Sequence, residues 1–142
     1  MTTAVEIASA ICAHLNSTPL ALDFEAMRKY RPAYTLDELA TLRVTVVPKS
    51  VAISNAARNT DYFEVAVDVA VQKQVQPDNL GELDALAAFI EQVADTLRHQ
   101  RLPGYPAAAW QSLAADPIFD PDHLSERNVF TAVLTVTYRV QR

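Results

Sequence analysis

The segment DYFEVAVDVAVQK, residues 61–73, alternates apolar and other side chains without a break, and it constrains the fold more than any other stretch. Successive side chains of a β-strand point to opposite faces, so one face would be wholly apolar. That face carries Phe63, Val65, Val67, Val69 and Val71. The opposite face is mixed and carries Tyr62, Glu64, Ala66, Asp68, Ala70 and Gln72. The pattern predicts a strand in a sheet that is covered on one face only.

The length of this strand is a second constraint. At about 3.3 Å per residue, the segment would extend about 43 Å. The 142 residues, half of them hydrophobic, predict a single domain over residues 1–142. A compact domain of this size has a diameter of about 37 Å. The strand is therefore expected to reach or pass the edge of its own domain.

Two helices are predicted from apolar residues at three- and four-residue spacing. One begins at Thr2 or Thr3 and ends near Asn16, and the other runs over Leu80–Gln100. Both have one apolar side, which is typical of helices that pack on a sheet. The second helix is about 31 Å long, so it can cover much of the apolar face of the strand at 61–73.

Three further strands are predicted, at Leu22–Tyr30, Leu42–Val47 and Asn128–Val140, and Val51 and Ile53 extend the second of them beyond a bulge. The polar connection Ser54–Thr60 is short enough to join that strand to the one at 61–73 as an antiparallel hairpin. These elements predict an α+β fold. It is a mostly antiparallel sheet of about four strands, with two main helices packed on one face and a long protruding hairpin.

Residues 101–127 differ from the rest of the chain because prolines interrupt every long element there. Only Ala107–Ala114 is expected to form a short helix or strand, and Asp122 is expected to cap a short turn at His123–Glu126. A connection of this length inside a compact domain is either functional or contains a missed element. Both interpretations stay open from the sequence.

Composition and charge argue against several classes of protein. The net charge of -5 argues against a nucleic-acid-binding surface spread over the whole protein. The single cysteine, Cys12, forms no internal disulfide and is expected to be a buried thiol. Glu6 and His14 break the apolar run of the N-terminus, which fits neither a signal peptide nor a membrane span. An intracellular protein is expected.

Few residues suggest catalysis. The most suggestive cluster is Asp116, Asp120, Asp122 and His123, in the sequence DPIFDPDHL, since spaced oxygen ligands hold hard cations. The cluster lacks the glycine and the terminal glutamate of an EF-hand loop, and aspartate beside proline is typical of turns. We therefore predict no catalytic, cofactor or metal site. A small metal-dependent enzyme remains an alternative, as does a ligand-binding domain with a pocket near Trp110, between the second helix and the sheet.

Several segments resemble a known family. They include RKYRPAYTLDELATLRVTVVPKS, DYFEVAVDVAVQKQV, LDALAAFIEQVADTL and DPIFDPDHLSERNVFTAVLTVTYR. In their order, and in phrases such as LRVTVVP and FTAVLTVTYR, they resemble the tail terminator, or head-to-tail joining, proteins of tailed bacteriophages and prophages. The resemblance covers nearly the whole chain and involves no catalytic motif.

The resemblance implies a structural virion protein that forms a ring, commonly a hexamer, at the head-proximal end of the tail tube. Such a ring ends tube polymerisation and joins the tail to the head connector. The implied partners are other copies of the chain, the tail tube protein and connector or neck proteins. Genomic DNA would pass through the lumen without specific binding. The protein would lie in the virion, and in the host cytoplasm during assembly. Another neck, minor tail or head completion protein is the alternative.

Two groups of residues are candidates for these contacts. The hairpin tip and the proline-rich segment are expected to contact the neighbouring subunit, the tube or the connector. The interface candidates are Asn55, Arg58, Asn59, Trp110 and Phe119. Glu64 and Asp68 are candidates for the lumen, because carboxylates there would repel the passing DNA backbone. No cofactor is expected.

Overall fold

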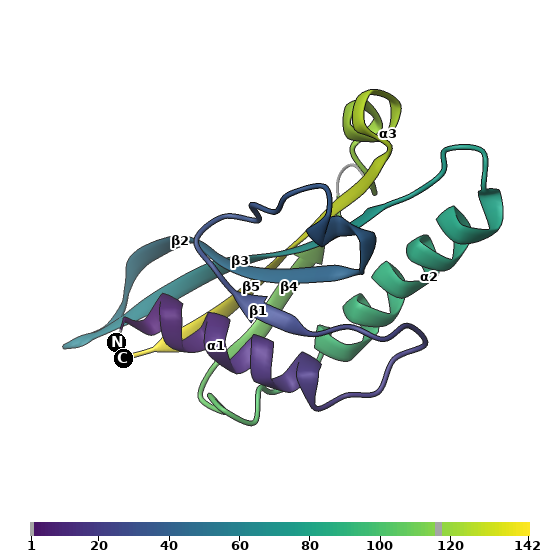
Figure 1. The fold of residues 1–142 in the computed structure, drawn as a ribbon. Helices are drawn as coiled ribbons and strands as arrows, with labels where there is room; N and C mark the ends of the chain where they lie inside the picture. The colour runs from purple at the N-terminus through teal and green to yellow at the C-terminus, as the bar shows by residue number, and fades with distance from the viewer. Residues whose placement is uncertain (1, 116–117) are drawn as a thin grey trace.

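The computed structural model describes residues 2–115 and 118–142 (Figure 1). Within these residues the chain has an α+β fold, with a mixed five-stranded sheet and three α-helices. The elements in chain order are α1 (Thr3–Asn16), β1 (Ala26–Arg28), the 3-10 turn η1 (Glu38–Ala40), β2 (Arg43–Ala57), β3 (Thr60–Gln74), α2 (Leu80–Leu97), β4 (Ala109–Ala114), α3 (Pro121–Arg127) and β5 (Val129–Gln141). None of the described helices is both long and apolar enough to cross a membrane.

The strand order is β1-β2-β3-β5-β4, and every neighbouring pair except one is antiparallel. The exception is β1, which runs parallel to β2. The predicted strand at Leu22–Tyr30 is therefore wrong in length, because only Ala26–Arg28 pairs. The side chain of Asn16, at the end of α1, fixes where it begins: Asn16 Nδ2 donates to the Ala26 carbonyl at 3.0 Å, and the Ala26 N–H donates to Asn16 Oδ1 at 2.7 Å.

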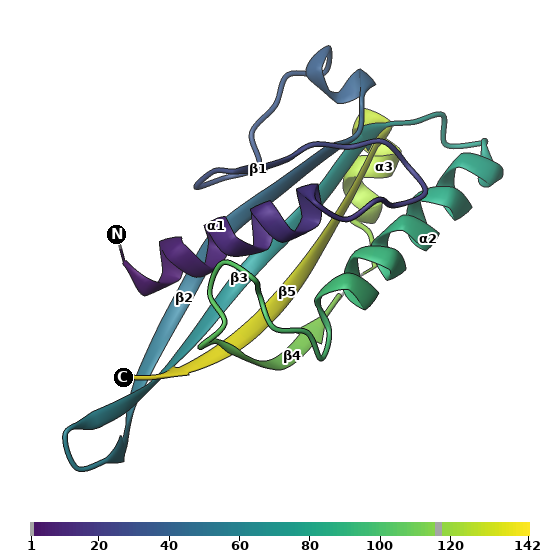
Figure 2. The same cartoon turned by 90° about the horizontal axis from the view of Figure 1, so that it is seen from below.

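The helices α1 and α2 cover the same face of the sheet, as predicted (Figure 2). On that face the central strand buries Val65, Val67, Val69 and Val71 completely. The strand β5 lies between β3 and β4 and adds Leu134, Val136 and Tyr138 to the same core. The alternation in both strands therefore identified the core face correctly. The helix α2 ends at Leu97 rather than Gln100, and His99 has a positive φ of 55°.

The second face of the sheet is partly covered, and here the prediction of a one-sided sheet was wrong. Ala70 is 1% exposed and Gln72 8%, although both lie on the mixed face of β3. The segment between β1 and β2 folds back over this end of the sheet. Its Tyr34 hydroxyl lies 2.8 Å from Thr45 Oγ1 across a hydrogen bond, and Leu39 of η1 is buried. Alternation along one strand carries no information about a distant loop that returns over it.

The β2–β3 hairpin is longer than predicted, and it extends beyond the helices at one end of the molecule (Figure 2). The segment Ser54–Thr60 is not a loop, because pairing continues through Asn55 with Asp61 to Ala57 with Thr60. Only Arg58 and Asn59 form the turn, and Asn59 has a φ of 67°. Asparagine is among the few residues that adopt this left-handed conformation readily. A bulge at Lys49, between Pro48 and Ser50, interrupts the pairing nearer the core.

Residues 101–127 contain two elements that the sequence left undecided. Ala109–Ala114 forms the edge strand β4, which is paired antiparallel with β5. The helix α3 begins after Asp120, whose Oδ1 accepts from the backbone N–H of Asp122 at 2.9 Å and of His123 at 3.2 Å. The prediction that Asp122 is the cap was wrong by two residues. Pro121 occupies the first turn, where a missing N–H leaves no hydrogen bond unmade.

Candidate assembly surface

The end of the β2–β3 hairpin beyond the bulge at Lys49, residues 50–66, is the candidate functional surface, and we call it the arm. The register places Val51 opposite Val65 and Ile53 opposite Phe63, so these side chains share the face that forms the core. Yet Val51 is 43% exposed and Ile53 60%. The core face thus continues along the arm past the point where the helices cover it. An apolar surface of this kind on a projecting element is typical of a protein contact site.

The outer edge of the arm is also unpaired. The strand β1 reaches only Val44–Val46 of β2, and the last bond on this side joins the Lys29 N–H to the Val46 carbonyl at 3.0 Å. Beyond that bond no strand in the described parts of the chain lies beside β2. Pro48 lacks an N–H, which is tolerated at an edge. A free edge with exposed apolar side chains is a template for pairing with another chain.

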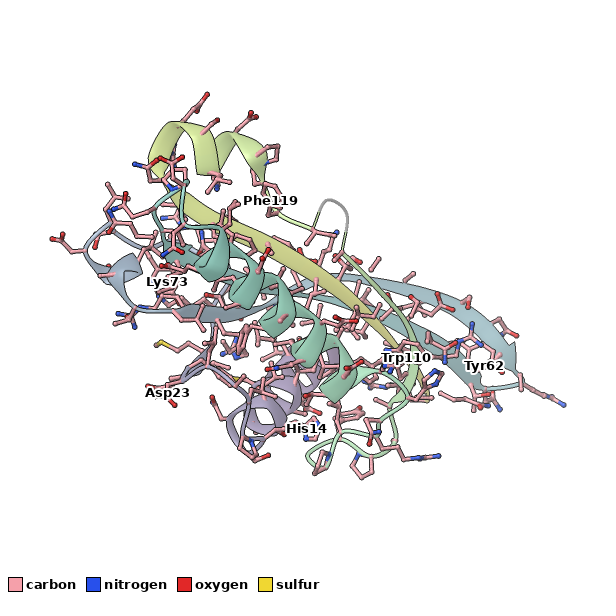
Figure 3. All side chains as sticks on the ribbon, turned by 90° about the vertical axis from the view of Figure 1, so that its right-hand side faces the viewer. His14, Asp23, Tyr62, Lys73, Trp110 and Phe119 are labelled. Carbon is pink, nitrogen blue, oxygen red and sulfur yellow. The ribbon has the colours of Figure 1, made fainter. Side chains whose placement is uncertain are left out.

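Contacts with the end of β5 hold the base of the arm in place. Arg139 contacts Glu64 through Nε at 3.2 Å and Nη2 at 2.5 Å, and its guanidinium lies over the Tyr62 ring at 4.6 Å. Two backbone hydrogen bonds join Asp61 and Arg142. Tyr62 marks this end of the molecule in Figure 3. The arm is therefore an ordered extension of the sheet that is supported on one side only.

The structure places the five predicted interface residues at different points. Asn55, Arg58 and Asn59 lie together at the exposed tip of the arm. Trp110 lies on β4, half-buried, with its ring 4.5 Å from that of His99. Phe119 lies just before α3, 38% exposed, and stacks on Phe130 at 6.0 Å. Figure 3 shows Trp110 toward the end of the molecule that Tyr62 marks and Phe119 near α3, so these two side chains do not lie together.

The lumen candidates Glu64 and Asp68 lie on the face of the sheet opposite α1 and α2, and both have partners. Glu64 binds Arg139, as described above. Asp68 Oδ1 accepts from Thr135 Oγ1 at 2.7 Å and lies 3.8 Å from Lys49 Nζ. Each carboxylate is thus accompanied by a cation on the same face. The local charge is balanced rather than strongly acidic.

Sequence reasoning assigned Val51 and Ile53 to a strand but did not identify them as a surface. The signal that could have identified them is the predicted length of the strand at 61–73. Because that strand was expected to pass the edge of the domain, residues paired with its projecting end would be exposed as well. The sequence predicted a bulge before Val51, but the register that pairs Val51 with Val65 and Ile53 with Phe63 came only from the structure.

The cluster considered as a metal site contains Asp116, Asp120, Asp122 and His123, and the structure describes the last three of these residues. Asp116 lies outside the described residues. Asp120 caps α3, and His123 Nδ1 lies 2.9 Å from Thr131 Oγ1 in a hydrogen bond. Across residues 2–115 and 118–142, no group of three or more histidine, cysteine, aspartate or glutamate side chains is placed to hold a metal ion.

The partly buried Cys12, which was expected to be buried, and the buried Tyr138 have shifted pKa values. Burial raises the pKa of the Cys12 thiol, which donates to the Ala26 carbonyl at 3.1 Å and behaves as a packed core group. Burial likewise raises the pKa of the Tyr138 phenol, which lies at the base of the arm opposite Val65. A raised pKa favours the neutral thiol and the neutral phenol. Neither group is therefore poised for acid–base or nucleophilic chemistry.

A scan against protein-family models gave no match, and a search of curated protein sequences gave none either. The functional assignment therefore depends on the residues of this chain and on their arrangement.

Proposed function

We propose that the protein is a structural subunit of a phage tail, which assembles with copies of itself into a ring at the head-proximal end of the tail tube. The ring ends tube polymerisation and joins the tail to the head connector. The arm carries this proposal, because it continues the apolar core face beyond the helices with Val51 and Ile53 exposed. A neighbouring subunit that covers this face would bury the apolar area that the single chain leaves in water.

The sheet has a second free edge, which makes a head-to-tail arrangement of subunits possible. The strand β4 pairs only with β5 in the described structure, on the opposite side of the sheet from the arm edge of β2. Two different edges on one subunit suit a heterologous contact, which closes into a ring when the rotation between subunits closes. The resemblance of the sequence to tail terminator proteins supports a ring, commonly a hexamer.

The mass of the assembly in solution tests the proposal. Size-exclusion chromatography with light scattering should give a mass above that of the 15.6 kDa chain, and negative-stain images should show rings. Replacing Val51 and Ile53 together by serine should give a folded monomer, as judged by circular dichroism. Leu80→Ser is the matched control, because Leu80 is 70% exposed but lies on α2, away from the arm. It should leave the assembly intact.

A strict monomer at every concentration that also fails to bind purified tail tubes would contradict the proposal. Binding to heads but not to tail tubes would instead favour the alternative, a head completion or other neck protein. These two binding measurements distinguish the roles, because a terminator must contact the last ring of the tube.

Within this proposal Glu64 and Asp68 face the lumen through which DNA passes. Because Arg139 and Lys49 accompany them, removing both carboxylates would leave a net positive surface that attracts the DNA backbone. Reversing both charges to lysine should leave rings intact and impair DNA passage, measured as infectivity of complemented particles. Full infectivity of that variant would exclude the lumen assignment.

A further inference from the structure

A groove of about 220 Å³ lies between α2 and α3, and we call it the α2–α3 groove. Leu83 and Ala87 line it from α2, Phe119 from the segment before α3, Leu124 from α3 and Phe130 from β5. An apolar cavity of about 150 Å³ holds a benzene molecule. The groove therefore has room for a branched aliphatic side chain.

The groove is apolar and exposed. Ile118, which also lines it, is 57% exposed, and Phe119 is 38% exposed. A separate, larger pocket lined by Tyr34, Gln72 and Arg127 has polar and charged side chains in its wall, whereas the walls of this groove are almost wholly apolar. Exposed apolar side chains that gather around a groove are typical of a site that another polypeptide covers.

The arm of the same subunit cannot fill the groove. The strand β5 connects the two sites, because Phe130 near its start lines the groove and Val140 near its end pairs with Phe63 of the arm. Ten residues of β5 separate these positions, which is about 33 Å of strand. Figure 3 shows Phe119 and Tyr62 toward different ends of the molecule. An arm and a groove can therefore meet only between two copies of the chain.

The charges of the two sites are opposite. Arg58 at the tip is the only charged residue in the outer part of the arm, residues 50–60. Asp84 of α2 is the only charged residue among those that line the groove in the described chain. Within residues 2–115 and 118–142, no ion pair joins Arg58 or Asp84 to another side chain. Complementary charges of this kind steer two surfaces together and fix their orientation.

We propose that the arm of one copy docks in the α2–α3 groove of the next copy, with Val51 and Ile53 on the apolar wall and Arg58 toward Asp84. The contact joins opposite ends of the subunit, so it is heterologous and gives a ring where the rotation between copies closes. The inference rests on the proposed ring and adds which surfaces form its contacts. It also brings Phe119 and the tip of the arm into one interface, although they lie far apart within a subunit.

Disulfide trapping tests the contact on the full chain, in a Cys12→Ala background that leaves no other cysteine. A chain with Ile53→Cys is mixed with a chain with Ala87→Cys under mild oxidation. A covalent dimer should form in the mixture and in neither chain alone, because a disulfide needs Cβ atoms about 4 Å apart. Ile53→Cys mixed with Ser112→Cys, which is exposed on the free edge of β4, is the matched control and should give no dimer.

Blocking the groove is a second test. Ala87→Glu places a carboxylate in the groove and should raise the dissociation constant of the assembly at least ~10-fold, because the apolar arm would lose its cover. Ala88→Glu is the matched control, since Ala88 is exposed on the same helix but does not line the groove. Both positions lie three or four residues from Asp84 and Glu91, so the charge effects within the helix are similar.

Light scattering over a concentration series measures the dissociation constant of each variant, and circular dichroism verifies that each is folded. Ala88→Glu should assemble as the wild type does. Leu80→Ser should also leave the assembly intact, because Leu80 does not line the groove.

A charge exchange tests the orientation of the arm. Arg58→Glu and Asp84→Arg should each weaken the assembly, and more so at low salt, because each places like charges together. The double variant should recover part of the loss, since its charges are opposite again. A double variant that assembles no better than the weaker single variant would overturn this orientation.

The outcomes separate this inference from the proposed ring. Rings that persist unchanged in Ala87→Glu would overturn the groove contact and leave the ring standing. The same follows if Ile53→Cys forms covalent dimers only with Ser112→Cys or only with a second Ile53→Cys chain. A wild-type chain that is monomeric at every concentration would instead overturn the ring itself, and the groove contact with it.

Discussion

The two halves of the β2–β3 hairpin have the same alternating pattern but opposite environments. Near the core, Val44 and Val46 pair with Val71 and Val69, and all four are fully buried. Beyond the bulge, Val51 and Ile53 occupy the same face, yet 43% and 60% of their surface is exposed. The difference arises from the layer above the sheet, because the helices cover only the first half (Figure 2). Alternation therefore determines which face is apolar, and the helices determine how much of it is buried.

The largest contrast is expected between Leu134→Ala and Ile53→Ala. Leu134 lies opposite Val69 and is 1% exposed, so its truncation should lower the free energy of unfolding by about 2–5 kcal/mol. In the monomer, Ile53→Ala should change it by less than about 0.5 kcal/mol. Urea unfolding of each variant measures both values. Similar losses would mean that the arm is as well packed as the core.

The two asparagines with positive φ give a smaller contrast. Asn128 has a φ of 55° and caps α3 just before β5, while Asn59 has a φ of 67° in the turn of the arm. Asn128→Ala should cost about 1–2 kcal/mol, because alanine is strained in the left-handed region. Asn59→Ala should cost less global stability, since the tip can open locally without unfolding the core. Glycine at each position is the control, and it should restore most of the loss.

Tyr138 lies where the two halves meet, and its hydroxyl is buried without a partner in the described part of the chain. Tyr138→Phe should leave stability unchanged or raise it by up to about 1 kcal/mol. Burial raises the pKa of Tyr138 above its ordinary value of 10.0. The phenol therefore ionises at a lower pH in the unfolded chain than in the folded one. Its contribution to the free energy of unfolding is complete below pH 10 and is lost as the pH rises above 10. The wild type should lose stability more steeply than Tyr138→Phe above pH 10, as measured by denaturant titrations.

The smallest effect is expected for the ion pair at the base of the arm. The side chains of Glu64 and Arg139 are 40% and 39% exposed, so Glu64→Gln should cost about 0.2–1 kcal/mol, and less in high salt. Lys73 and Glu82 form a pair at the other end of β3, with side chains only 28% and 29% exposed. Glu82→Gln should show a weaker salt dependence. The reverse order of salt dependence would contradict the argument that the more exposed pair is screened more strongly.

Local patterns predicted much of the fold. The spacing of Ile7, Ile11 and Leu15 identified the buried side of α1, and the alternation around Val67 and Leu134 identified the core face of β3 and β5. At 101–127 the sequence left Ala107–Ala114 undecided between helix and strand and predicted only a short turn at His123–Glu126, because each element there is short and a short pattern resembles that of a turn. The first strand was predicted too long because Leu22–Glu25 alternates apolar and acidic side chains, as a strand does, without pairing with another strand.

The candidate sites were predicted less completely. The projecting hairpin and the tip residues Arg58 and Asn59 followed from strand length and polarity. The exposed face of Val51 and Ile53 required the register around Lys49. A pocket lined by Tyr34, Gln72 and Arg127 was not predicted, because it is formed by three segments that are distant in the sequence.

The sequence by itself determined which side chains share a face on each long element, since the periods of strands and helices are properties of the local backbone. Only the tertiary structure decided that β1 pairs parallel to β2, that a loop covers Ala70 and Gln72, and that the helices end short of the arm. The physical reason is that burial depends on contacts between residues far apart in the chain. Neither alternation nor helical spacing within one segment encodes such contacts.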